Sequence, residues 1–158
     1  MAQLTPRFSA DRTVREYTEQ RYLPASKSFL ERAADYGKIG KQIAEKLQKL
    51  NQKWDSLHFG EVKITTIENQ YKFNVQVYFS DLDPDLVQVE LFANGANGSK
   101  PEIIKMIRET KTGSSINTYY YSALASSERP VSDFTPRAMA KIAGVSVPLE
   151  SSLITWQH

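Results

Sequence analysis

Three aromatic residues are the side chains of this sequence best suited to contact a sugar. Trp54, Tyr119 and Tyr121 each carry a flat apolar ring with a polar edge, and Trp156 adds a second indole. Successive side chains of a strand point to opposite faces, so Tyr119 and Tyr121 would share one face and Tyr120 would point to the other. We therefore predict a sugar contact at Trp54, Tyr119 and Tyr121. Aromatic rings are often buried, and packing in a core is the alternative for all three.

The sequence has one cluster of carboxylates, formed by Asp81, Asp83 and Asp85. Their alternate spacing is like the first half of a calcium-binding loop, but the glycine and the distal glutamate that complete such a loop are missing. Acid and base catalysis on a sugar needs two carboxylates held at a fixed distance across a cleft. The segment instead has the composition of a polar turn between strands, and we assign it neither a metal nor a catalytic role.

Residues for nucleophilic catalysis are scarce. Cysteine is absent, which excludes thiol nucleophiles, thiolate zinc sites and disulfides. The two histidines, His58 and His158, are far apart, and no nucleophile-elbow motif accompanies them. Gly95 and Gly98 lack the strand and helix context of a phosphate-binding loop. We therefore predict no catalytic, cofactor-binding or metal-binding residue in this chain.

Two helices are predicted to form an N-terminal arm. Ser9 and Asp11 favour a helix start, and Pro24 is expected to end this first helix near Tyr22. A second, much longer helix is expected from about Ser26, because apolar residues then recur every three or four positions. This apolar stripe consists of Phe29, Ala33, Tyr36, Ile39, Ile43, Leu47, Leu50, Trp54 and Leu57. So long a stripe must lie against the rest of the chain, a second copy or another protein.

The opposite face of the long helix is basic, with lysines at positions 38, 41, 46, 49 and 53. Asp35 and Glu45 dilute this face and no nucleic-acid motif accompanies it, so we expect a solvated surface and no nucleic-acid partner. Residues 1–60 carry eleven Lys and Arg against seven Asp and Glu, whereas residues 61–158 carry nine against eleven. This step in charge, together with a change in hydrophobic period, predicts a domain boundary near Gly60.

From Val62 onward, apolar residues alternate with polar ones as in half-buried strands. Seven short strands are predicted, at about residues 62–67, 72–79, 86–93, 103–108, 117–124, 131–142 and 152–156. Seven short strands separated by polar turns are typical of an immunoglobulin-like sandwich. The expected fold class is α+β, with a helical arm over residues 1–59 and an all-β sandwich over residues 60–158. No apolar run predicts a membrane span or an export signal, so a cytoplasmic location and no membrane partner are expected.

Residues 8–17 have the sequence FSADRTVREY. This run resembles the start of the last helix of the catalytic domain in the α-glucan (glycogen and starch) phosphorylases, and the chain as a whole resembles their C-terminal part. Later motifs resemble the bacterial and archaeal branch of the family, which carries an added C-terminal module. These motifs are YLPA (22–25), WDSLHFG (54–60), VQVY (75–78), DLDP (81–84), VELF (89–92), VPLE (147–150) and LITW (153–156). Their order and spacing cover most of the 158 residues.

The resemblance implies what the chain does. In that family a lysine of the catalytic domain holds pyridoxal phosphate, and the enzyme is a hexosyltransferase that moves glucosyl units between an α-1,4-glucan and phosphate. No lysine here lies in a matching motif, so the cofactor is expected only in a catalytic portion preceding Met1. The chain is then a non-catalytic accessory part, and its partner is the catalytic portion or a second copy bound through the long helix. Under the alternative, a free-standing glucan-binding or structural module, Trp54, Tyr119 and Tyr121 would contact α-glucan.

Overall fold

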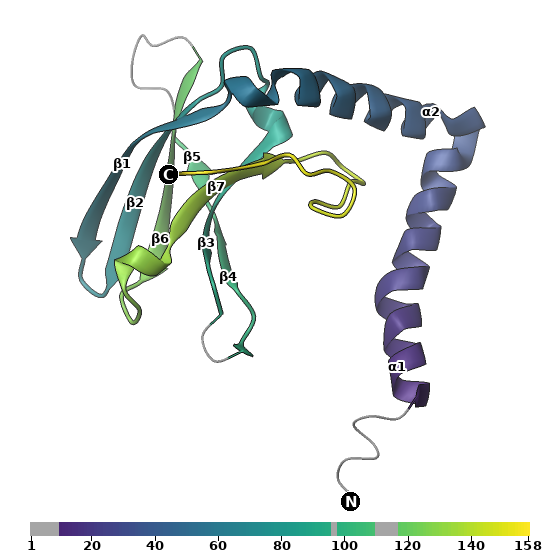
Figure 1. Cartoon of the computed structure of the whole chain (residues 1–158), viewed down its shortest axis with the longest axis horizontal. Coiled ribbons are helices and arrows are strands. Elements are labelled where there is room, and N and C mark those ends of the chain that lie inside the picture. The colour runs from purple at the N-terminus through teal and green to yellow at the C-terminus, as the bar shows by residue number, and fades with distance from the viewer. Residues whose placement is uncertain (1–9, 96–97, 110–116) are drawn as a thin grey trace, which may run out of the picture. The chain divides into compact units, whose positions relative to one another are not determined.

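The computed structural model, which describes residues 10–95, 98–109 and 117–158, has the predicted α+β architecture. A helical arm is followed by two antiparallel β-sheets of four strands each, stacked as a sandwich (Figure 1). The chain forms two compact units that divide between Glu45 and Lys46. The helical segments end at Ser56 and the first strand begins at His58, close to the change of period in the sequence. Ser9, which was predicted to start the first helix, lies outside the described residues.

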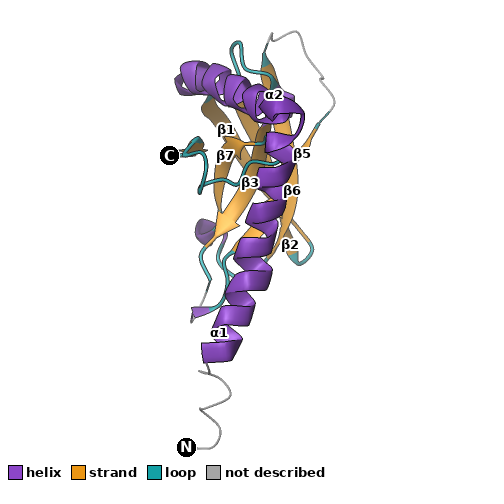
Figure 2. Cartoon of the chain, turned by 90° about the vertical axis from the view of Figure 1, so that its right-hand side faces the viewer, coloured by secondary structure: helices purple, strands orange, loops and turns teal. Residues whose placement is uncertain are grey.

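The helical segments of the arm follow one another from Ala10 to Ser56 (Figure 2). They are α1 (Ala10–Tyr17), a π-helix (Thr18–Tyr22), α2 (Leu23–Lys53) and a 3₁₀ turn (Trp54–Ser56). The prediction that Pro24 ends the first helix is wrong. Just before the proline, the Leu23 N–H donates to the carbonyl of Thr18, five residues back, so this turn is wider than an α-helical turn. In an α-helix the proline ring clashes with the carbonyl four residues back, and the wider turn relieves that clash.

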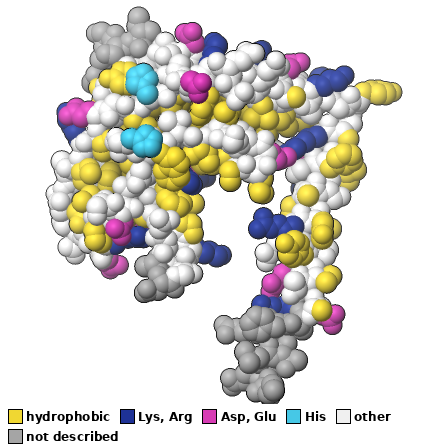
Figure 3. Space-filling model, in the orientation of Figure 1, with side chains coloured by type: hydrophobic (Ala, Val, Ile, Leu, Met, Phe, Trp, Pro, Cys, Tyr) yellow, Lys and Arg dark blue, Asp and Glu magenta, His cyan; other side chains and the backbone are white. Residues whose placement is uncertain are grey.

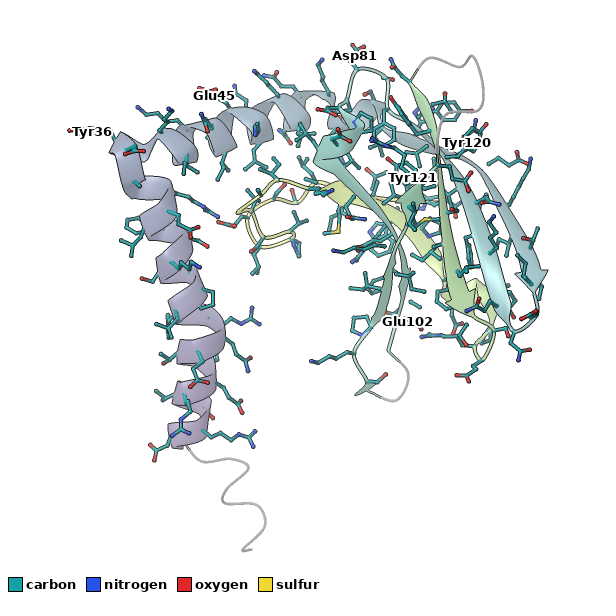
Figure 4. The ribbon with its side chains drawn as sticks, turned by 180° about the vertical axis from the view of Figure 1, so that it is seen from behind. Tyr36, Glu45, Asp81, Glu102, Tyr120 and Tyr121 are labelled. Atoms are coloured by element: carbon teal, nitrogen blue, oxygen red, sulfur yellow. The ribbon has the colours of Figure 1, made fainter. Side chains whose placement is uncertain are left out.

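The arm is interrupted within α2, at residues 34–37. Ala34 has an extended ψ of 153°, and Asp35, Tyr36 and Gly37 have φ values of 51°, 58° and 76°. Left-handed backbone is routine for glycine and costly for residues with a Cβ. The break between the two helices therefore lies here rather than at Pro24, and the helix that follows it is the shorter one. The side chain of Tyr36 is fully exposed at this interruption (Figure 4).

The sandwich consists of sheet A, with strand order β1-β2-β6-β5, and sheet B, with strand order β4-β3-β7-β8. The strands of sheet A are β1 (His58–Ile67), β2 (Gln70–Tyr78), β5 (Ile107–Arg108) and β6 (Thr118–Ser126). The strands of sheet B are β3 (Val87–Ala93), β4 (Glu102–Lys105), β7 (Thr135–Ala140) and β8 (Ile154–Trp156). In chain order they reproduce the ABED and CFG sheets of an immunoglobulin domain, with β4 added beside β3.

One predicted strand becomes two. Residues 103–108 divide into β4 in sheet B and β5 in sheet A, so the described residues form eight strands instead of about seven. The Met106 N–H donates to the Val89 carbonyl of sheet B (2.9 Å), whereas the Glu109 N–H donates to the Tyr120 carbonyl of sheet A (2.8 Å). Apolar and polar residues alternate in the same way in both sheets, so the period-two pattern carries no sign of the crossing.

Apolar side chains from alternate strand positions fill the space between the sheets. In β2, Phe73, Val75 and Val77 are almost fully buried, while the residues between them are half-buried. The buried series in β3 is Val87, Val89, Leu91 and Ala93. Leu50 from the C-terminal end of α2, Trp54 from the 3₁₀ turn and Leu57, the residue that follows this turn, add to this core. In the part of the chain that the structure describes, no helix has the length and apolar composition needed to cross a membrane.

Candidate functional site

The three aromatic residues predicted to contact a sugar do not present open ring faces. Trp54 is 6% exposed and Tyr121 is 4% exposed, so both rings are covered by the core. Tyr119 is half-buried, with its ring edge-on to Phe79 at a centroid distance of 5.4 Å and the Arg108 guanidinium over its face. Tyr121 packs against the same phenylalanine, with centroids 6.1 Å apart. Stacking a sugar on Trp54 or Tyr121 would therefore require the core to open.

The alternation predicted for the tyrosine run is confirmed. Tyr120 points to the opposite face of β6 from Tyr121 and is 45% exposed (Figure 4). Its hydroxyl accepts a hydrogen bond from the Gln76 amide at 3.2 Å. Tyr120, to which no sugar contact was assigned, is therefore more accessible than Tyr121.

A small cavity lies beside Tyr121. Its volume is about 190 Å³, and its polar lining consists of Asp85, Gln88, Arg108, Tyr121 and Lys141. The rest of the lining is apolar and comes from Pro84 in the turn before β3, from the start of β3 and from the crossing between the sheets. The cavity is smaller than pockets for drug-sized ligands, which measure about 300–1,000 Å³.

Local structure brings three of these polar side chains together. Asp85 lies in the 3₁₀ turn Pro84–Leu86, which begins where the Asp83 carboxylate accepts the Asp85 N–H at 2.9 Å. Arg108 is paired directly opposite Tyr121 where β5 meets β6. The Arg108 guanidinium then reaches the Asp85 carboxylate at 2.8 Å. The cluster of Asp85, Arg108 and Tyr121 thus depends on a turn and two strands that are distant in sequence.

Two members of this cluster, Tyr121 and Arg108, have raised pKa values and so keep their protons at neutral pH. Burial raises the pKa of Tyr121 to about 12, although the charge of Arg108 opposes the rise, so the phenol keeps its proton at neutral pH. Burial alone would lower the pKa of Arg108, but the hydrogen bond and charge of Asp85 outweigh it and raise that pKa. The Tyr121 hydroxyl has no hydrogen-bond acceptor among the described residues, since its charged neighbour Arg108 can only donate.

The raised pKa of Tyr121 predicts a loss of stability in alkali. The folded chain holds this proton up to about pH 12, whereas an unfolded tyrosine releases it near pH 10, so stability should fall as the pH rises between these values. We expect the loss to be about 1–3 kcal/mol. Urea unfolding at pH 9.5 and 11.5 should show it in the wild type and not in Tyr121→Phe. The exposed neighbour provides the control, and a Tyr120→Phe variant that also lost the pH dependence would contradict the assignment.

The acidic segment forms a polar turn, as its composition predicts. Asp81 is exposed (Figure 4). Asp83 is exposed as well, and its side chain caps the turn described above. Among the described residues, no three His, Cys, Asp or Glu side chains gather in a way that could hold a metal. His58 begins β1, where its ring stacks on Tyr78 with centroids 4.7 Å apart and its Nδ1 lies 3.0 Å from the Ser56 carbonyl. These contacts give the segment and the histidine structural roles.

A row of four side chains crosses sheet B, and sequence patterns did not predict it. Lys105, Glu90, Arg137 and Trp156 lie directly opposite one another on β4, β3, β7 and β8. Arg137 Nε donates to Glu90 at 2.7 Å, and the guanidinium lies 4.4 Å from the ring centroid of Phe92 and 5.1 Å from that of Trp156. Both charged side chains are largely buried. Charged residues at alternate strand positions usually face water, so no sequence pattern indicated that this pair is buried.

The apolar stripe of the arm is covered at one end only. Leu50, Trp54 and Leu57 are buried in the sandwich unit, whereas Ile39 is 44% exposed. Further toward the N-terminus, hydrophobic side chains lie at the surface (Figure 3). Six large ones within residues 14–30 are 58–69% exposed, namely Val14, Tyr17, Tyr22, Leu23, Phe29 and Leu30. Such exposure is typical of a surface that binds another protein.

The π-helix aligns four of these side chains. Residues five apart, such as Tyr17 and Tyr22, are separated by about 140° around an α-helix. In the wider turn they become neighbours, and their ring centroids lie 6.2 Å apart. Val14 precedes Tyr17 by three positions and Phe29 follows Tyr22 by seven, and both spacings keep residues on one side of an α-helix. We call the surface formed by Val14, Tyr17, Tyr22 and Phe29 the arm face.

The cavity beside Tyr121 and the arm face are thus two separate candidate sites, one polar and one apolar. The sequence matches no model of a known protein family, and it matches none of the curated proteins with which it was compared.

Proposed function

We propose that this chain is the C-terminal, non-catalytic part of a cytoplasmic α-glucan phosphorylase of the bacterial and archaeal type. Its role is to dock onto the catalytic part through the helical arm and to position or stabilise it. The catalytic part performs the phosphorolysis of α-1,4-glucan and holds the pyridoxal phosphate of that family. The observation that carries the proposal is the arm face, because four large apolar side chains are left uncovered on one helix.

Sequence and exposure point to the same partner. The residues that resemble the last helix of a phosphorylase catalytic domain include Val14 and Tyr17, which belong to the arm face. A helix that completes a catalytic domain would bury these side chains in that domain. Burying four such side chains would favour association by about 1.5–3 kcal/mol each before the entropic costs of binding are counted.

Co-expression tests the proposal. The genomic reading frame that precedes the codon for Met1 is expected to encode a phosphorylase catalytic region. When the two chains are expressed together, we expect them to elute as one complex in size-exclusion chromatography with light scattering. The complex should release glucose 1-phosphate from glycogen and phosphate. A preceding frame unrelated to phosphorylases, together with separate elution of the two chains, would refute the proposal.

Matched substitutions locate the contact on the arm face. Phe29→Asp and Tyr22→Asp are each expected to weaken the complex at least about tenfold, since buried aromatic anchors contribute about 2 kcal/mol or more at interfaces. Lys27→Asp introduces the same residue two positions from Phe29, on the opposite side of the helix, and should leave the affinity unchanged. Equal weakening by all three variants would indicate a general loss of helix rather than loss of a contact.

A further inference from the structure

A groove is lined by strands of both sheets, beside Met106, where the chain crosses from one sheet to the other. Its volume is about 540 Å³, which lies within the usual range of about 300–1,000 Å³ for ligand pockets. β6 and β4 supply most of the lining, and β1, β2 and β5 supply the rest. The groove is thus a third candidate site, and it lies within the sandwich unit.

The backbone of β6 is open along this groove. β5 pairs with β6 over two residues only, and among the described strands none pairs with β6 beyond Ser122 on this side. The Glu109 N–H donates to the Tyr120 carbonyl across the same edge, and in a strand this direction recurs at every second residue. The N–H and carbonyl of Leu124 therefore point out of sheet A. Across the groove, β4 is the edge strand of sheet B.

The apolar side chains of the groove are accessible. Ile67, Ile107 and Leu124 line it and are 49%, 74% and 50% exposed. Ile104 and Ala123 are half-buried, and each lies opposite a core residue of the neighbouring strand, so both point inward. A strand laid beside β6 would place every second side chain against Ile104 and Ala123, because successive side chains alternate between faces. The groove therefore suits an extended segment with apolar residues at alternate positions.

Two lysines give the groove a positive charge. Lys72 and Lys105 line it, and neither forms an ion pair with a carboxylate of the described residues. Lys105 is directly opposite Glu90, but that carboxylate accepts from Arg137 at 2.7 Å. A second copy of the chain pairing along the same edge would bring the same two lysines toward them, and like charges repel. The charges therefore favour an acidic partner over a second copy.

We propose that this groove binds an extended acidic segment of another protein as an added strand of sheet A. The backbone of the segment bonds to Leu124, and its alternate apolar side chains pack on Ile104 and Ala123. The acidic side chains between them are attracted by Lys72 and Lys105. In strand addition the main-chain bonds provide affinity and the alternate side chains provide specificity. The site is separate from the arm face and needs no phosphorylase partner.

Titration of the isotope-labelled full-length chain with a synthetic peptide, followed by amide NMR shifts, tests the proposal. The probe is an acetylated and amidated peptide of about six residues, roughly 20 Å when extended, in which valine and glutamate alternate. We expect saturable shifts at residues 102–107 and 122–126, with a dissociation constant of about 0.1–1 mM, because a short strand makes few bonds. A peptide with the same valines and glutamates in two separate blocks should bind at least about fivefold more weakly.

Methylated peptides test whether the segment joins the sheet as a strand. In an added strand only every second N–H faces β6, and the others face solvent. Methylating the backbone nitrogens of one alternate set, the valines or the glutamates, should therefore abolish binding. Methylating the other set should leave the dissociation constant nearly unchanged. Equal affinity of the two methylated peptides would overturn the proposal.

Charge reversal tests the role of the lysines. Lys72→Glu combined with Lys105→Glu should weaken the valine–glutamate peptide about tenfold and strengthen a valine–lysine peptide by a similar factor. Lys63→Glu combined with Lys141→Glu changes the net charge equally at exposed lysines outside the groove, and it should leave both affinities unchanged. The same spectra report whether each variant is folded.

Three results would refute binding of an acidic strand. The first is the absence of saturable shifts at the groove, and the second is an equal loss of affinity in the two double variants. The third is a set of shifts at residues 122–126 that grows with protein concentration without peptide, which would place a second copy in the groove. The titration uses no catalytic partner, so its outcome is independent of the co-expression experiment.

Discussion

Replacing Glu90 with alanine is expected to lower the free energy of unfolding by about 3–5 kcal/mol. Glu90 and Arg137 are both largely buried, and removing the carboxylate leaves the guanidinium enclosed without a counter-ion. The rings of Phe92 and Trp156 beside Arg137 restrict its movement toward water. Urea unfolding followed by tryptophan fluorescence measures the loss, since Trp54 and Trp156 both lie in the sandwich unit.

Two further variants test whether burial is the cause. The double variant Glu90→Leu with Arg137→Met removes both charges and should recover most of the lost stability, because no unpaired charge remains. Asp85→Ala breaks an ion pair whose side chains are 74% and 39% exposed, and it should cost less than about 1 kcal/mol. If Glu90→Ala and Asp85→Ala destabilised the chain equally, enclosure of the Glu90 pair would have no energetic effect.

Leu50→Asp is expected to destabilise the sandwich by about 3–5 kcal/mol. Leu50 is 2% exposed, so the substitution both removes a packed side chain and places a carboxylate in an apolar environment. The same urea titration measures the effect. Circular dichroism at the end of the titration would show whether the arm unfolds together with the strands.

Ile39→Asp is the matched control for Leu50→Asp. Ile39 belongs to the same predicted stripe, but its side chain is 44% exposed and lies in the other unit. We expect a change of less than about 0.5 kcal/mol in the stability of the sandwich. If Ile39→Asp matched Leu50→Asp, the sandwich would depend on the whole length of the stripe.

Much of the fold could be predicted from the period of the apolar residues, because helices and strands bury side chains at different spacings. The same period could not reveal the π-helix before Pro24 or the crossing at Met106. The π-helix and the crossing are both defined by which backbone N–H bonds to which carbonyl, and the types of the side chains do not indicate this pairing. The left-handed backbone of Asp35 and Tyr36 likewise has no apolar signature.

The candidate sites were harder to predict than the fold. Alternation correctly separated Tyr120 from Tyr121, but it does not say which face of a strand is covered. Trp54 is covered because the end of the arm joins the core. The pairing of Asp85 with Arg108 requires a turn to meet the edge of sheet A, and such long-range encounters leave no local pattern in the sequence.

The wide turn at Thr18–Tyr22 also makes the arm tolerant of a change in its own length. Each residue of an α-helix advances the chain by about 100° around the axis, so residues four apart lie only about 40° apart. Deleting one residue from this turn would let it close as an ordinary α-helical turn, with Tyr17 and Tyr22 four positions apart and still on one side. Recognition by this arm is therefore set by angular phase as well as by composition, and a homologue with one residue fewer here would present the same side to its partner through a regular helix.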